Sequence, residues 1–116
     1  MSLRTPSGAM LSAVGSGTSA IAVSSPSNSR HAIHAITANW NTAPSTSQSI
    51  TITLNSVEGA AYDTILRKED PSVGSVVDYS FEWDNPLRVQ LGSTIDVAYT
   101  NTDSRTVSVE IIYETY

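Results

Sequence analysis

The chain has 116 residues, a formal charge of -5 at neutral pH and no cysteine. Its length suits a single domain, which can bury roughly two thirds of the surface that the unfolded chain exposes. The lack of cysteine excludes disulfide scaffolds and thiolate zinc sites. The acidic charge argues against a nucleic-acid binder, because such proteins gather Lys and Arg on one face.

Residues 1–18 are rich in Ser, Gly and Thr and have too few apolar side chains to fold alone, so we expect an extended N-terminal arm. Ser12, Gly15 and Ser16 interrupt its apolar residues, which argues against a secretory leader. No stretch of the chain approaches the roughly 20 apolar residues that span a bilayer, so no membrane partner is expected. The arm side chains expected to contact a protein partner are Leu3, Arg4, Met10, Leu11 and Val14.

Residues 19–116 alternate between apolar and polar side chains, which predicts one β-domain. A short first strand around Ile21 and Val23 ends at turn-forming residues near Pro26. The next predicted strand covers residues 31–40, and strict alternation divides its side chains between two faces. One face carries Ala32, His34, Ile36, Ala38 and Trp40, and the other carries His31, Ile33, Ala35 and Thr37.

Two further strands are predicted from SITITLN, residues 49–55, and from AYDTILRK, residues 61–68. The AYDTILRK segment also fits a helical turn, but its Tyr, Thr and Ile residues favour a pleated surface. A loop containing Pro71 and Gly74 precedes another predicted strand, residues 76–83. Its inward side chains are expected to be Val77, Tyr79, Phe81 and Trp83.

A turn is predicted at Pro86, followed by strands 87–91 and 95–99 around a Gly-Ser turn and a last strand, 107–113. About eight strands with little helical periodicity predict an all-β fold. Because each strand has one apolar face, we expect a two-sheet antiparallel β-sandwich whose sheets cover each other at about 10 Å. Jelly-roll and immunoglobulin-like connections both fit this pattern.

The two histidines and the acidic residues between positions 78 and 84 do not form a convincing reactive group. His31 and His34 are three residues apart in a predicted strand, so their rings should lie on opposite faces and cannot chelate one metal ion together. Asp78, Glu82 and Asp84 have the side chains of a calcium site or a glycosidase pair, but no Gly-spaced calcium loop accompanies them. We interpret them as a solvated strand edge and expect no catalytic, cofactor or metal site.

Trp40 and Trp83 are candidates for stacking on sugar rings, provided that they are exposed. Trp40 lies at the end of a predicted strand between Asn39 and Asn41, which makes it the better candidate for exposure. Trp83 shares its predicted face with apolar neighbours, so burial is its simpler interpretation. These residues leave a carbohydrate-binding β-sandwich module as the alternative function.

Two stretches resemble a known family. Residues 78–101, DYSFEWDNPLRVQLGSTIDVAYTN, and residues 105–114, RTVSVEIIYE, resemble the C-terminal half of small jelly-roll virion proteins of tailed bacteriophages. That family comprises capsid decoration or cement proteins and tail accessory subunits. Its strands end before a Pro-Leu pair, continue through a hairpin with a Gly-Ser or Gly-Asp turn, and close with a Val-rich strand. Residues 49–66 are similar to the middle portion of these proteins.

The resemblance implies a jelly roll and a non-enzymatic structural subunit of the virion. Such a subunit binds neighbouring coat or tail proteins, often as a homotrimer, and needs no cofactor. Residues 1–18 would then gain order by lying on a neighbour or on the shell.

Overall fold

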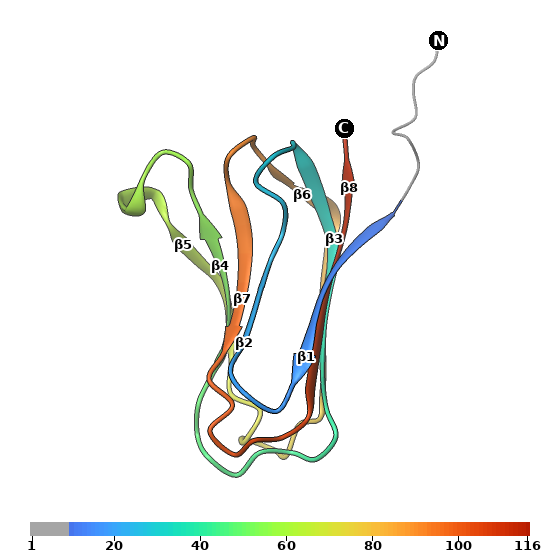
Figure 1. Cartoon of the computed structure of the whole chain (residues 1–116), viewed down its shortest axis with the longest axis vertical. Coiled ribbons are helices and arrows are strands. Elements are labelled where there is room, and N and C mark those ends of the chain that lie inside the picture. Colours follow the sequence, from blue (N-terminus) through green and yellow to red (C-terminus); the bar gives the residue numbers. More distant parts are fainter. Residues whose placement is uncertain (1–9) are drawn as a thin grey trace.

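Residues 10–116, which the computed structural model describes, form two four-stranded antiparallel sheets packed face to face (Figure 1). Among these residues no helix is long and apolar enough to cross a membrane. The all-β sandwich predicted from two-residue alternation is therefore confirmed. The elements in chain order are β1 (Leu11–Gly17), β2 (Ile21–Ser24), β3 (His31–Trp40), β4 (Ile50–Asn55), the 3-10 turn η1 (Ala60–Tyr62), β5 (Thr64–Glu69), β6 (Asp78–Val89), β7 (Thr94–Tyr99) and β8 (Val107–Thr115).

The strand order distinguishes between the two connection patterns that the sequence allows. One sheet has the order β1-β8-β3-β6 and the other has the order β2-β7-β4-β5. The chain thus pairs its first strand with its last, its second with its seventh, its third with its sixth and its fourth with its fifth. This nested pairing is that of a jelly roll, a double Greek key of eight strands.

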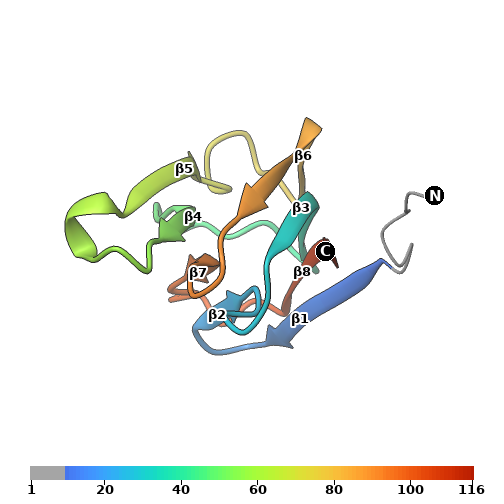
Figure 2. The ribbon, with the colours of Figure 1, turned by 90° about the horizontal axis from the view of Figure 1, so that it is seen from above.

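The two sheets lie closest together on one side of the sandwich. The backbones of β1 and β2 come within 8 Å of each other, as do those of β2 and β8. On the opposite side, β5 and β6 are further apart, as the view from above shows (Figure 2). Inward side chains fill the space between the sheets.

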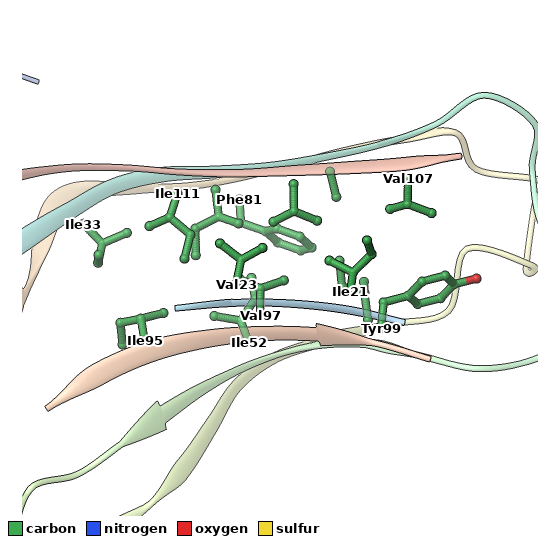
Figure 3. Close-up of a cluster of buried hydrophobic side chains, with 14 of the residues drawn as sticks. Ile21, Val23, Ile33, Ile52, Phe81, Ile95, Val97, Tyr99, Val107 and Ile111 are labelled. Atoms are coloured by element: carbon green, nitrogen blue, oxygen red, sulfur yellow. The ribbon is translucent and has the colours of Figure 1, made fainter. Parts of the chain in front are cut away.

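Alternate side chains of both sheets form one apolar core (Figure 3). Burying a side chain of this kind stabilises the fold by about 1.5–3 kcal/mol relative to leaving it exposed. The second sheet is required because each strand can hide only one of its faces. The buried residues of this core are Ile21, Val23, Ile33, Ile36, Ala38, Trp40, Ile50, Ile52, Phe81, Val89, Ile95, Val97, Tyr99, Val107, Val109 and Ile111.

The second half of the expected N-terminal arm is a strand of the sandwich. β1 pairs with β8 from Leu11 opposite Tyr113 to Gly17 opposite Val107. The expected boundary at residue 18 is therefore corrected: the folded domain includes β1. Small inward residues in β1 give no hydrophobic signal in the sequence. Leu3 and Arg4, two of the predicted partner contacts, lie outside the described residues.

A β-bulge at His34 breaks the predicted alternation of β3. Ile33 lies opposite Tyr113 and Ala35 lies opposite Ile112, so His34 is an extra residue in this strand. The bulge reverses the parity of the residues before it. His31 and Ile33 are consequently buried like Ile36, Ala38 and Trp40. The predicted division of β3 into two faces therefore holds after the bulge and is wrong before it.

The partner strand β6 is more irregular at the same level. Leu87 lies opposite Ile33 and Glu82 opposite Ala35, so the four residues from Trp83 to Pro86 face His34 alone. Proline is tolerated in a strand at such a bulge because it has no N–H to contribute. The chain does not turn back at Pro86, and the predicted strands 76–83 and 87–91 form one strand. The predicted count of eight strands holds because β1 is added while these two merge.

Candidate functional site

The loops of the sandwich gather at two ends, which differ in chemistry. Loops 25–30, 56–63 and 90–93 form what we call the upper end, and loops 18–20, 41–49, 70–77 and 100–106 form the lower end (Figure 1). Large exposed apolar side chains are concentrated at or near the upper end. They are Met10, Leu11, Val57, Tyr62, Ile65, Leu91 and Tyr116; the others described are Val14 on the outer face of β1 and Val73 and Val77 at the lower end.

The loops of the upper end are tied to one another. The backbone N–H of Val57 donates to Ser93 Oγ at 2.9 Å, and the N–H of Gly92 donates to the carbonyl of Ser27 at 2.9 Å. Gly92 has a φ of 92°, and a Cβ there would come within 2.6 Å of Val57 Cγ2. Loops 56–63 and 90–93 therefore pack directly together, which holds Val57 and Leu91 in a fixed arrangement.

The 56–63 loop projects Tyr62 into solvent. The carboxylate of Asp63 accepts the backbone N–H of Ser56 at 2.8 Å and closes the loop on itself. Gly59, with a φ of 115°, supplies the left-handed residue that precedes η1. The Tyr62 side chain is 62 % exposed. The upper end thus presents aromatic and aliphatic groups from a backbone with its own hydrogen bonds.

Polar contacts dominate the lower end, centred on Asp103. Its Oδ2 accepts the backbone N–H groups of Ser45 at 2.7 Å and Thr46 at 2.8 Å, and its Oδ1 accepts the Thr46 hydroxyl. The hydrogen bond from the Thr46 hydroxyl, followed by those from the backbone, lowers the pKa of Asp103 to about 2. Asp70 plays a similar part between Ser47 and Ser72, and hydrogen bonds from their hydroxyls, that of Ser47 first, lower its pKa.

Asn101 organises the last of these loops. Its backbone has a φ of 58°, a left-handed conformation that Asn tolerates better than most residues. Its Nδ2 donates to the carbonyls of Ser19 and Arg105, and its Oδ1 accepts the N–H of Arg105. These ties connect the β1–β2 and β7–β8 loops, so we interpret the lower end as a structural closure of the sandwich.

His31 and Ser25 form the closest approach to a nucleophile and base in the described chain. His31 Nε2 lies 2.8 Å from Ser25 Oγ, and His31 Nδ1 lies 2.9 Å from the carbonyl of Ser29. Ser25 Oγ also accepts the backbone N–H of Ile95 at 2.8 Å. Both side chains are buried, so a substrate has no access to the hydroxyl. The group ties β2, β3 and β7 together.

His34 lies away from this buried group, on the other side of the bulge. Its Nε2 is 2.6 Å from Oε1 of Glu114, and both side chains are partly exposed. The carboxylates interpreted above as a solvated edge make local contacts: Asp78 accepts from Asn39 and Glu82 from Ser80. Within residues 10–116, no group of three acidic or histidine side chains is arranged to hold a metal ion.

The two tryptophans do not share a surface. Trp40 is 4 % exposed and packs edge-on against Tyr79 and Tyr99, with ring centroids 5.8 and 5.3 Å away. The prediction that Trp40 is the more exposed tryptophan is therefore wrong, because the lower-end loops cover the end of β3. Trp83 is half-buried, and the guanidinium of Arg67 lies 5.7 Å from its ring centroid.

The described arm residues point to different places. Met10 and Leu11 are exposed where β1 begins, near the upper end, whereas Val14 is exposed on the outer face of the first sheet opposite Glu110. Sequence reasoning missed the upper-end residue Val57, whose only signal was an apolar residue within a turn-rich loop. Tyr62 was predicted to lie in a strand, residues 61–68, but it lies in the 3-10 turn η1, and the strand begins at Thr64.

No protein-family model matches the chain, and a search of curated proteins found no match. Among solved structures, the chain is similar to Yersinia pseudotuberculosis-derived mitogen (YPM), with a TM-score of 0.40 and 14% sequence identity. This likeness covers 97% of the chain and 88% of the mitogen chain. A likeness at this level says nothing of what the chain binds.

Proposed function

We propose that the chain is a non-enzymatic structural subunit of a virion, a capsid decoration or cement protein or a tail accessory subunit, that binds neighbouring coat or tail proteins. The sequence resemblance of residues 78–101 and 105–114 supports this assignment. The nested strand order also agrees with it, since jelly rolls build viral capsid domains as well as lectins and cupins.

The observation that carries the proposal is the contrast between the two ends of the sandwich. Exposed apolar side chains that gather at one place mark sites of protein contact, whereas single ones do not. Val57, Tyr62 and Leu91 are exposed on two loops that pack together through Val57 and Gly92, and the hydrogen bonds of these loops hold their backbones in place before binding. A preformed surface loses less conformational freedom on binding. The upper end is therefore the proposed contact with the virion partner.

The carbohydrate-binding alternative loses its main support. Its stacking residue Trp40 is buried in the core, and Trp83 alone, beside Arg67, does not make a platform.

Substitution of the upper-end residues tests the proposed contact. Replacing Val57, Tyr62 and Leu91 together by Ser should weaken binding to particles that lack this protein by about tenfold or more, since truncating a central contact residue commonly costs over 1 kcal/mol. Co-sedimentation of the purified chain with such particles measures it. Val73→Ser is the matched control, because Val73 is 70 % exposed but lies at the lower end. Equal binding by the triple variant and the control would contradict the proposal.

The resemblance also predicts a homotrimer. Light scattering of the purified chain should then give three times the 12.3 kDa mass of one chain. A monomer at micromolar concentration would contradict the trimer and leave the virion contact to be judged by the particle-binding experiment.

A further inference from the structure

Three polar atoms near the lower end are buried and have no hydrogen-bond partner among residues 10–116. They are Trp40 Nε1, Tyr99 Oη and Arg105 Nε. The first two belong to side chains that are only 4 % and 2 % exposed. Buried polar groups in folded proteins nearly always have a partner, which is often an ordered water. Three orphaned atoms in one region therefore call for a ligand.

The three atoms lie in one neighbourhood. The rings of Trp40 and Tyr99 meet edge-on, with centroids 5.3 Å apart and planes at 86°. The Trp40 N–H is near enough to lower the pKa of Tyr99, against the larger effect of burial, which raises it, although the two groups do not reach ordinary hydrogen-bond geometry. Arg105 lies at the same end of the sandwich, because Asn101, two residues after Tyr99, is hydrogen-bonded to both the N–H and the carbonyl of Arg105.

The hydroxyl of Tyr99 points along the sandwich toward its lower end. Figure 3 shows the oxygen at the far side of the ring, at the end of the core where Val107 lies. The loops that close this end carry Asp103 and Asp70, whose carboxylates are held by the hydrogen bonds described above. The polar atoms therefore lie between the apolar core and a ring of polar loops.

The chemistry of the atoms restricts what can bind there. The indole N–H and the guanidinium Nε–H only donate, and the phenol both donates and accepts, so the ligand must accept two or three hydrogen bonds. Burial disfavours negative charge at this place and raises the pKa of Tyr99, and the carboxylates of Asp103 and Asp70 raise it further. A halide or a carboxylate is therefore a poor fit, and a neutral acceptor is favoured.

We propose that Trp40, Tyr99 and Arg105 form a site for one ordered internal water molecule, which joins the end of β3 to the end of β7 beneath the loops of the lower end. The water accepts from the indole and guanidinium N–H groups and donates to or accepts from the phenol. The water then makes about three hydrogen bonds, which is the number that buried waters typically make. This inference is independent of the proposed role in a virion.

A crystal structure from crystals soaked in bromide tests the site directly. The expected result is one water within about 2.7–3.2 Å of both Trp40 Nε1 and Tyr99 Oη, without anomalous bromide signal. Bromide at this position, or a direct hydrogen bond between Trp40 and Tyr99 with no water, would overturn the proposal.

Equilibrium unfolding of Tyr99→Phe tests the site in solution. If a water bridges the phenol, removing the hydroxyl should lower the folding equilibrium constant about fivefold, the loss expected for one hydrogen bond. If the hydroxyl is orphaned, the variant should instead be as stable as the parent chain or more stable, and this result would overturn the proposal. Tyr113→Phe is the matched control, since Tyr113 is a half-buried tyrosine whose hydroxyl is not among the orphaned atoms.

Discussion

Gly15 lies in β1 opposite Val109, where the edges of the two sheets come close together. A Cβ at this position would lie 2.5 Å from Val23 Cγ2, a distance that requires the backbone or Val23 to move. The glycine therefore permits the close approach of β1 and β2 that seals this side of the core.

Gly15→Ala should accordingly destabilise the fold by about 1–3 kcal/mol, the usual cost of forcing an extra carbon into a packed contact. Urea unfolding measures the change. Ser16→Ala is the matched control, because Ser16 is the next residue and points to solvent. If both variants unfold at the same urea concentration, the close contact between Gly15 and Val23 does not require a glycine.

Asp103 shows how one carboxylate holds a loop. Its pKa of about 2 lies below its ordinary value of 3.8 because the hydrogen bonds from Thr46 and Ser45 favour the charged form. A carboxyl whose pKa is lower in the folded state than in the unfolded state stabilises the fold above the unfolded value. That contribution is lost as the pH falls toward the folded value.

Asp103→Asn should therefore lower stability at pH 7, and the difference from the parent chain should shrink between about pH 4 and pH 2. Urea midpoints at pH 7, 4 and 2.5 measure it. Asp84→Asn, on the exposed part of β6, is the control. A difference that persists unchanged at pH 2.5 would show that the charge of Asp103 is not the cause.

At the scale of elements, alternation predicts the faces of most strands but not where alternation breaks. Ile50 and Ile52 in β4 and Val107 and Val109 in β8 are buried as their pattern predicts. The bulge at His34 has no signature in the sequence, because it depends on the partners of β3. The pattern cannot show that Trp40 ends beneath loops that are distant in the chain.

β1 is a strand that the hydrophobic pattern does not reveal at all. Its inward positions include Ala13 and Gly15, which are too small to be recognised as a core face, and the strand exists because the edge of β8 is available to pair with it. The arrangement of the upper end is also not predictable from the pattern, since Val57 packs against Gly92, next to Leu91, only after pairing between distant strands has brought two loops together.

Deletion of residues 1–17 should therefore lower the urea midpoint and cause association that depends on protein concentration, because it uncovers the edge of β8. Sedimentation and urea unfolding measure the two effects. Deletion of residues 1–9 is the matched control, since it retains every β1–β8 pair. A chain without residues 1–17 that stays as stable and as dispersed as the control would show that β1 is dispensable.

At the scale of the whole molecule, the nested pairing makes folding a long-range problem. Gly17 pairs with Val107, so the outermost pair forms only after almost the whole chain has been brought together. Closing large loops before contacts form slows folding.

Refolding should consequently take milliseconds to seconds, as in other β-proteins dominated by distant pairs. Stopped-flow fluorescence is suited to this measurement, because the buried Trp40 reports core formation. Folding complete within microseconds would contradict the nested pairing as the slow step.

The pairing of Leu11 with Tyr113 places the two extremes of the described chain on neighbouring strands, about one strand spacing apart. A short linker from Tyr116 to Met10 would therefore close the chain into a ring with little strain. New ends could be opened beside the exposed Val73 in the 70–77 loop. Such a circular permutant should keep both sheets, and a peptide fused after Tyr116 in the ordinary chain would be displayed beside the surface that we assign to partner contact.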